Sequence, residues 1–237
     1  MYLPPSKTLL LCLTFLCANS AQAVTAFSEK FSSTLKPARW SLQSEGSGKL
    51  AISKGKLSFT VPTTPKDEEF TFLTLKRPQL KYGENWEVIV DVANLSVPGG
   101  SIGVGLRIEN AADRTDGVSI ELDRVGENAS KVTGVFITDD DDDLARDIDE
   151  PVSGTKASLR ATFSAKTKLI TFWYRNSTKA AWEKLANFSP ANSASAQRRG
   201  DWGMTPATGK FKVVLFAYTE EKFATAGKVT LDNLIIR

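Results

Sequence analysis

Histidine is absent from this chain of 237 residues, and its only two cysteines, Cys12 and Cys17, lie near the N-terminus. The lack of histidine excludes Ser-His-Asp and Cys-His catalysis as well as His-ligated zinc. We expect residues 1–23 to be a cleaved signal peptide, so a mature domain of residues 24–237 has no disulfide and no thiol. Any catalysis in that domain must depend on carboxylates, supported by Lys, Tyr or a hard metal ion.

The first 23 residues have the pattern of a secretory signal. Lys7 provides positive charge, residues 8–17 form an apolar run, and Ala21-Gln22-Ala23 has the small residues that a signal peptidase needs. The apolar run is shorter than the about 20 residues that cross a bilayer. We therefore expect cleavage between Ala23 and Val24, a secreted or periplasmic protein, and no membrane anchor.

Neither sign of charge predominates, because the chain has 30 basic and 27 acidic residues. Nucleic-acid binding needs a concentrated basic surface, and the sequence contains no stripe rich in Lys and Arg. We therefore expect no nucleic-acid partner.

Short strands are predicted along the whole mature chain, since alternating apolar and polar residues are interrupted by Gly, Asn, Asp and Pro. Tight turns at Ser53-Lys54-Gly55 and at residues 164–167 each join two such runs. The pattern predicts a single all-β domain, an antiparallel two-sheet β-sandwich. The predicted strands are 49–53, 55–61, 69–77, 86–95, 101–109, 117–124, 130–138, 157–165, 168–175, 210–219 and 227–236.

Two long stretches interrupt this pattern, in addition to a shorter loop expected at residues 62–68. Residues 139–150 contain the aspartate run Asp139–Asp143, and we expect a short helical turn there with Leu144 and Ile148 on one side. Residues 187–208 are rich in Ser, Ala, Asn and Gly and are predicted to form a long surface loop.

The order of these features resembles the concanavalin A-like lectin/glucanase superfamily, which includes laminin G-like jelly rolls. The resemblance rests on FSEKF at 27–31, Arg39-Trp40, YGENWEVIVDV at 82–92 and GKVTLDNLII at 227–236. It implies a jelly-roll sandwich. The superfamily contains lectins, glycosidases and adhesion modules, so the resemblance leaves the function open.

A glucanase-type site is one hypothesis that the resemblance implies. Such enzymes carry two glutamates on one strand, as nucleophile and general acid/base, and Glu121, Asp123 and Glu127 resemble that motif. Glu127 comes one or two residues late for this role, and a turn at Gly126 explains its position. This spacing favours a domain that is not an enzyme.

A glycan-binding face is the leading hypothesis. Alternation turns Gly103, Gly105, Arg107, Glu121 and Asp123 away from the core, and it does the same for Asp91, Trp173 and Arg175. If these residues share one face, two glycines leave a trough beside a partly exposed indole, and charged groups can bond to sugar hydroxyls. An ordinary solvated face, in a structural or adhesive domain without a small ligand, is the alternative.

Calcium is the one cofactor that the sequence suggests, as a structural ion. The aspartate run supplies oxygen ligands but lacks EF-hand spacing, so a solvated loop explains it equally well. Asp232 is a second candidate, through its resemblance to glucanases that bind an ion on the last strand. Its alternative role is a hydrogen bond that closes the chain ends.

Overall fold

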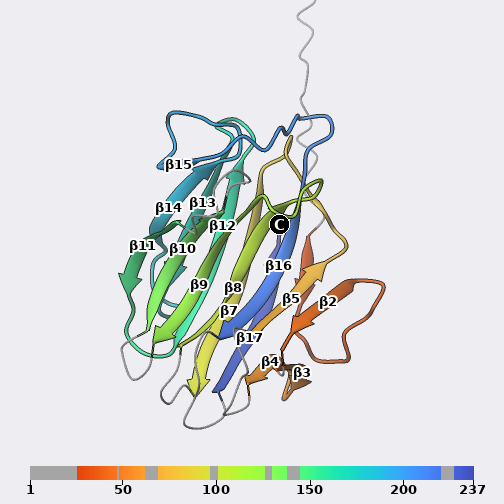
Figure 1. Cartoon of the computed structure of the whole chain (residues 1–237), viewed down its shortest axis with the longest axis vertical. Coiled ribbons are helices and arrows are strands. Elements are labelled where there is room, and N and C mark those ends of the chain that lie inside the picture. Colours follow the sequence, from red (N-terminus) through yellow and green to blue (C-terminus); the bar gives the residue numbers. More distant parts are fainter. Residues whose placement is uncertain are drawn as a thin grey trace, which may run out of the picture.

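The computed structural model describes residues 26–46, 48–61, 69–96, 101–125, 130–137, 145–219 and 227–237. These residues form two sheets packed face to face, and Figure 1 shows them as two layers of arrows. The prediction of an all-β, antiparallel two-sheet sandwich of jelly-roll type is confirmed. Within the described ranges, no helix is long and apolar enough to cross a membrane.

One layer is a nine-stranded sheet with the order β15-β14-β13-β12-β7-β17-β4-β3, in which β1 also pairs with β17. Every pair is antiparallel except β14 with β15. The first and last described strands lie side by side, since Phe27 of β1 pairs with Ile236 of β17. The strands are β1 (Phe27–Glu29), β3 (Lys49–Ser53), β4 (Lys56–Val61), β7 (Trp86–Ser96), β12 (Lys156–Ser164), β13 (Leu169–Arg175), β14 (Glu183–Ser189), β15 (Arg198–Arg199) and β17 (Gly227–Ile236).

The other layer is an eight-stranded sheet with the order β11-β10-β9-β8-β16-β5-β2, in which β6 also pairs with β16. Strands β11 and β2 form its two edges and lie at opposite sides of Figure 1. The strands are β2 (Trp40–Glu45), β5 (Glu69–Leu75), β6 (Leu80–Lys81), β8 (Ser101–Asn110), β9 (Gly117–Val125), β10 (Lys131–Ile137), β11 (Ala145–Pro151) and β16 (Lys210–Thr219).

The core lies between the sheets and contains one side chain from every second position of the long strands. Val88, Val90 and Val92 of β7 face it from one sheet, and the alternate apolar residues of β8 and β9 face it from the other. Because successive strand residues point to opposite sides, each polar partner in these strands is turned to the outer face of its sheet. This alternation decides which residues are available for a site.

The predicted hairpin at residues 53–56 is confirmed. Ser53 pairs with Lys56, and both central residues have positive φ, 51° for Lys54 and 72° for Gly55. Two positive φ values are the pattern of the type I′ turn, whose twist matches that of the flanking strands. The second hairpin, β12–β13, pairs Ser164 with Leu169 around the predicted turn.

The helical turn predicted within 139–150 is wrong where the structure describes the chain. Strand β11 runs along β10, with Thr133 opposite Asp149 and Gly134 opposite Ile148. A single helical turn fixes several residues for one hydrogen bond, whereas an edge strand gains a ladder of bonds from an existing neighbour. Lys131 adds an ion pair to Asp149 at 2.7 Å. Leu144 and the run Asp139–Asp143 lie outside the described residues.

The first residues of the loop predicted over 187–208 belong to a strand in the structure. Strand β14 extends to Ser189, and its residues from Leu185 to Ser189 are all buried. A bulge opposite Phe172 and Trp173 interrupts the register of this pair, which explains why no alternation marks the strand in the sequence.

Candidate functional site

The eight residues proposed as one binding face lie on two opposite faces of the sandwich. Asp91 belongs to β7, and Trp173 and Arg175 belong to β13, all on the outer face of the nine-stranded sheet. The other five lie on the outer face of the eight-stranded sheet, on β8 and β9: Gly103, Gly105, Arg107, Glu121 and Asp123. The single shared face is therefore wrong. Alternation tells which residues turn away from the core, but it does not tell to which sheet a strand belongs.

On the eight-stranded sheet, two glycines are covered by aromatic rings. Gly103 is the cross-strand partner of Tyr218, and Gly105 is the partner of Phe216. A Cβ atom at Gly103 would overlap the Tyr218 ring, and one at Gly105 would lie 2.8 Å from Cζ of Phe216. The predicted open trough beside these glycines is thus filled by the side chains of β16.

Glu121 and Asp123 are buried rather than exposed on this face. Glu121 is 3% exposed and accepts a 2.7 Å hydrogen bond from the Tyr218 hydroxyl. Asp123 is 2% exposed, and one of its oxygens lies 3.8 Å from the Lys131 ammonium. Glu127, the third residue of the proposed glucanase motif, lies outside the described residues.

This outer face also contains an open groove, which lies near the β2 edge of the sheet, over β2, β5, β8 and β16. Its volume is about 540 Å³. The side chains around it combine hydroxyls, amides, both charges and one aromatic ring. They are Ser41, Gln43, Phe72, Thr74, Leu75, Lys76, Gln79, Arg107, Glu109, Arg114 and Lys212.

Arg107 and Glu109 form the fixed centre of the groove. They are two residues apart on β8, both 13% exposed, and joined at 2.9 Å from Nε to the carboxylate. Burial lowers the pKa of the Arg107 guanidinium, while the adjacent Glu109 carboxylate opposes that shift. The guanidinium remains charged, because an arginine pKa starts so far above neutral. It lies against Gly117, where a Cβ atom would overlap it.

A second pair crosses the groove and joins segments far apart in the sequence. Arg114, from the β8–β9 connection, donates a 3.2 Å hydrogen bond to the amide oxygen of Gln43 on β2. Arg107 also donates a 3.3 Å bond to the carbonyl oxygen of Arg114, which ties the connection to the sheet. Arg114 and Gln43 are both exposed, so their polar groups can reach a ligand.

Except for Arg107, the groove residues were not predicted from the sequence. The alternation in β5 and β16 places Phe72, Thr74 and Lys212 outward, but nothing local distinguishes them from a solvated face. Arg114 and Gln79 lie in connections, where no periodic pattern exists.

Trp173, on the nine-stranded sheet, has the predicted partial exposure. Its side chain already contacts other side chains of that sheet. Its indole nitrogen donates a 3.1 Å hydrogen bond to Thr162, and the Arg160 guanidinium lies 5.5 Å from its ring. Arg160 also lies 5.3 Å from the ring of Trp182, over which Arg175 sits at 4.3 Å. These cation–π contacts occupy ring faces on which a sugar would stack.

The carboxylate of Asp232, the second calcium candidate, is engaged by protein groups of its own sheet. Its carboxylate lies 3.5 Å from the Lys56 ammonium and accepts a 2.8 Å bond from the backbone N–H of Asn233. Its cross-strand partner Asp91 is likewise bonded, to Ser158 at 2.6 Å and to the Asn233 amide at 2.9 Å. Calcium needs six to eight oxygen ligands, and no cluster of three acidic, His or Cys residues occurs in the described part of the chain.

No protein-family model and no curated protein matches this sequence. Solved structures do match. Lectin I-B4 from Griffonia simplicifolia, in a metal-free form, superposes with a TM-score of 0.60 at 9% identity, covering 90% of this chain and 99% of that one. An immunostimulatory antigen and pseudo β-1,3-glucanase of Mycobacterium tuberculosis gives 0.53 at 11% identity, covering 89% and 97%.

A third similar structure is the exoplasmic/lumenal domain of VIP36 in a form bound to Ca²⁺ and Man2. Its TM-score is 0.53 at 10% identity, covering 89% of this chain and 86% of that domain. At such low identity the likeness concerns the fold alone, and a fold does not determine function. The resemblance inferred from the sequence is confirmed at that level: the chain has the concanavalin A-like two-sheet sandwich fold.

Proposed function

We propose that this protein is a secreted, non-catalytic carbohydrate-binding module that holds a glycan in the groove over β2, β5, β8 and β16. The observation that carries the proposal is the composition of that groove. Planar polar side chains, which can make paired hydrogen bonds, surround a space of about 540 Å³ with one aromatic ring in it.

The chemistry of sugars matches such a lining. Neighbouring hydroxyls on a pyranose ring donate and accept in pairs, so arginine, glutamine and carboxylate groups can each engage two of them. Phe72, which is half-buried on β5, adds an apolar surface for the C–H face of the ring.

The groove is also organised before a ligand enters. The Arg107–Glu109 pair and the Arg114–Gln43 bond hold four of its polar groups in place. Side chains that are already ordered lose less conformational entropy on binding, which favours affinity.

The fold supports the proposal only by analogy, since similar structures include both lectins and glucanase-like proteins. Burial of Glu121 favours binding over hydrolysis. A catalytic carboxylate must reach the scissile bond, and Glu121 is enclosed and hydrogen-bonded to Tyr218.

A glycan array with the protein beginning at Val24 will identify a ligand, and calorimetry on that ligand tests the site. Arg114→Ala and Gln43→Ala should each weaken binding about tenfold, which corresponds to about 1.4 kcal/mol. Both side chains are exposed, so the fold should be retained. Arg199→Ala, an exposed arginine on β15 of the other sheet, is the matched control and should bind as the wild type does. Wild-type affinity in both groove variants would refute the proposed site.

Secretion is tested separately. Exported protein should begin at Val24 on N-terminal sequencing, and a product that begins at Met1 would contradict the signal peptide.

A further inference from the structure

The groove is strongly asymmetric in charge. Four basic side chains line it, namely Lys76, Arg107, Arg114 and Lys212. Glu109 is the one acidic residue among the described residues of the lining, and it is paired with Arg107. A ligand in the groove therefore meets three basic groups that this carboxylate does not neutralise.

A second hollow, which we call the edge hollow, has the same character. It has a volume of about 730 Å³ and lies where the segment before β2 meets the β5–β6 turn and the start of β16. Its basic side chains are Lys36, Arg39, Arg77 and Lys210. No acidic residue belongs to its described lining. Glu29 lies beside it and pairs with Arg39 at 3.4 Å.

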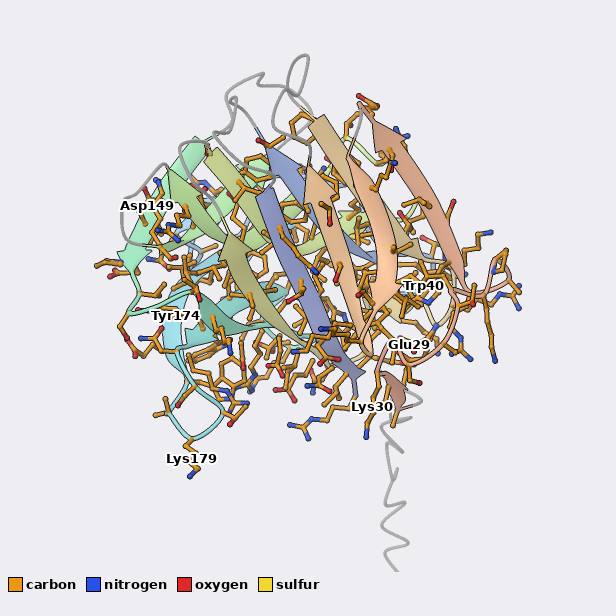
Figure 2. All side chains as sticks on the ribbon, turned by 90° about the horizontal axis from the view of Figure 1, so that it is seen from below. Glu29, Lys30, Trp40, Asp149, Tyr174 and Lys179 are labelled. Atoms are coloured by element: carbon orange, nitrogen blue, oxygen red, sulfur yellow. The ribbon has the colours of Figure 1, made fainter. Side chains whose placement is uncertain are left out.

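The two hollows adjoin each other. Gln79 lines both of them. Lys210 and Lys212 lie two residues apart on the same side of β16, about 7 Å from one another along the strand. We call the continuous surface through both hollows the basic track. Figure 2 shows this edge of the sandwich at Glu29 and Trp40, far from Asp149 on β11.

Positive charge is concentrated on the basic track, whereas the rest of the chain carries a small net negative charge. The track holds eight of the 30 basic residues and three of the 27 acidic ones, counting Glu109, Glu29 and Glu45, which accepts a 3.2 Å hydrogen bond from the Gln43 amide. The other 22 basic and 24 acidic residues together carry a net charge of −2. Like charges gathered on one surface repel one another, which opposes folding. The same positive charges attract anions to that surface.

We infer that the ligand of the groove is a polyanionic glycan, bearing carboxylate or sulfate groups, that extends from the groove into the edge hollow. The inference rests on the proposed function and adds the chemical class and the length of the ligand. Arginine forks bind carboxylates and sulfates in pairs, while Glu109, Gln43 and Gln79 accept or donate bonds to hydroxyls between the charged groups.

Single-stranded nucleic acid fits the track less well, although it is also a polyanion. Proteins that bind it stack successive bases on exposed aromatic rings. The described lining of the two hollows contains two aromatic residues, Phe72 and Phe27, and the Arg39 guanidinium already lies 5.3 Å from the Phe27 ring.

The test compares three polymers by calorimetry at low and high salt: polygalacturonate, dextran sulfate and neutral dextran. A triple variant, Lys36→Ala/Arg77→Ala/Lys210→Ala, removes three exposed charges from the edge hollow and leaves the groove intact. Its matched control is Lys179→Ala/Lys184→Ala/Arg199→Ala, which removes three exposed charges from the β13–β15 region. Both variants have the same net charge, so a difference between them reports the position of the charges.

We expect one or both anionic polymers to bind, with affinity that falls as salt rises. The edge-hollow variant should lose at least tenfold in affinity for polymer, and the control less than about threefold. Binding of polygalacturonate alone identifies carboxylates, and binding of dextran sulfate alone identifies sulfates.

Three results would overturn the inference. Neutral glycans that bind in an Arg114-dependent manner as tightly as anionic ones would leave the proposed function standing but not this ligand class. Equal losses in the two triple variants would show a diffuse charge effect. An oligodeoxythymidylate that competes with and outbinds both anionic glycans would assign the track to nucleic acid.

Discussion

The ring of Tyr218 lies over Gly103, in the space that a Cβ atom at that position would occupy. The two residues are cross-strand partners on β16 and β8. Gly103→Ala should therefore destabilise the fold by about 1–3 kcal/mol, as overpacking does in other cores. Urea unfolding measures this. In a Tyr218→Ala background the same substitution should cost much less, because the clash is gone. An equal cost in both backgrounds would contradict the packing.

Trp173→Ala should leave glycan affinity unchanged, because Trp173 lies on the sheet opposite the groove. Calorimetry with the array-identified glycan, beside Arg114→Ala, is the measurement. A loss of tenfold or more in Trp173→Ala alone would move the binding site to the nine-stranded sheet. Thermal melts must accompany both variants, since Trp173 also contacts Thr162 and Arg160.

Hydrolysis of β-glucans is not expected, because the Glu121 carboxylate is enclosed and bonded to Tyr218. Incubation with laminarin and lichenan, followed by a reducing-sugar assay, should show no product above buffer. Product release that disappears in Glu121→Gln would establish an enzyme and contradict the binding module.

Alkaline pH should weaken the fold partly through Tyr174. Burial, together with the 3.0 Å hydrogen bond to Glu183, raises the pKa of its phenol to about 12. Between pH 10 and pH 12 the unfolded chain loses this proton while the folded chain retains it, so stability falls as pH rises and is fully present below pH 10. Tyr174→Phe should show a shallower fall over that interval in urea melts. An unchanged slope would exclude this contribution.

Asp232→Asn should change stability by less than about 1 kcal/mol, because it removes a 3.5 Å ion pair whose Lys56 partner is half exposed to solvent. Thermal melts in EDTA and in millimolar calcium test whether an ion is bound. Any calcium-dependent rise in Tm should persist in Asp232→Asn. Loss of that rise in the variant would place the ion at Asp232 and refute the pairing with Lys56.

Much of the fold could be predicted from local patterns. Alternation in β7, β8, β9 and β13 identified both the strands and their buried residues, since a half-buried strand needs one apolar face. Strands β12, β16 and β17 were also predicted, but without an assignment of their buried residues. Strand β2 was not recognised, because five of its six residues are exposed and carry no alternation. Strand β14 was missed for the opposite reason, since its last five residues are all buried.

The sheet on which each candidate binding residue lies could not be predicted from local patterns. Period-two alternation turned Asp91, Arg107 and Trp173 away from the core, as the structure confirms, yet strand order placed Arg107 on one sheet and the other two on the opposite sheet. The sequence likewise predicted an open trough at Gly103 and Gly105, whereas in the structure the neighbouring strand β16 places two aromatic rings over these glycines.

Composition alone determined that residues 24–237 contain no thiol and no imidazole, which limits the available chemistry whatever the fold. The basic track was decided only by the tertiary structure. Lys36, Arg77, Arg107, Arg114 and Lys210 are scattered over 175 positions and form no charged run in the sequence. Antiparallel pairing across β2, β5, β16 and β8 brings them to one edge, because cross-strand neighbours are set by sheet order rather than by distance along the chain.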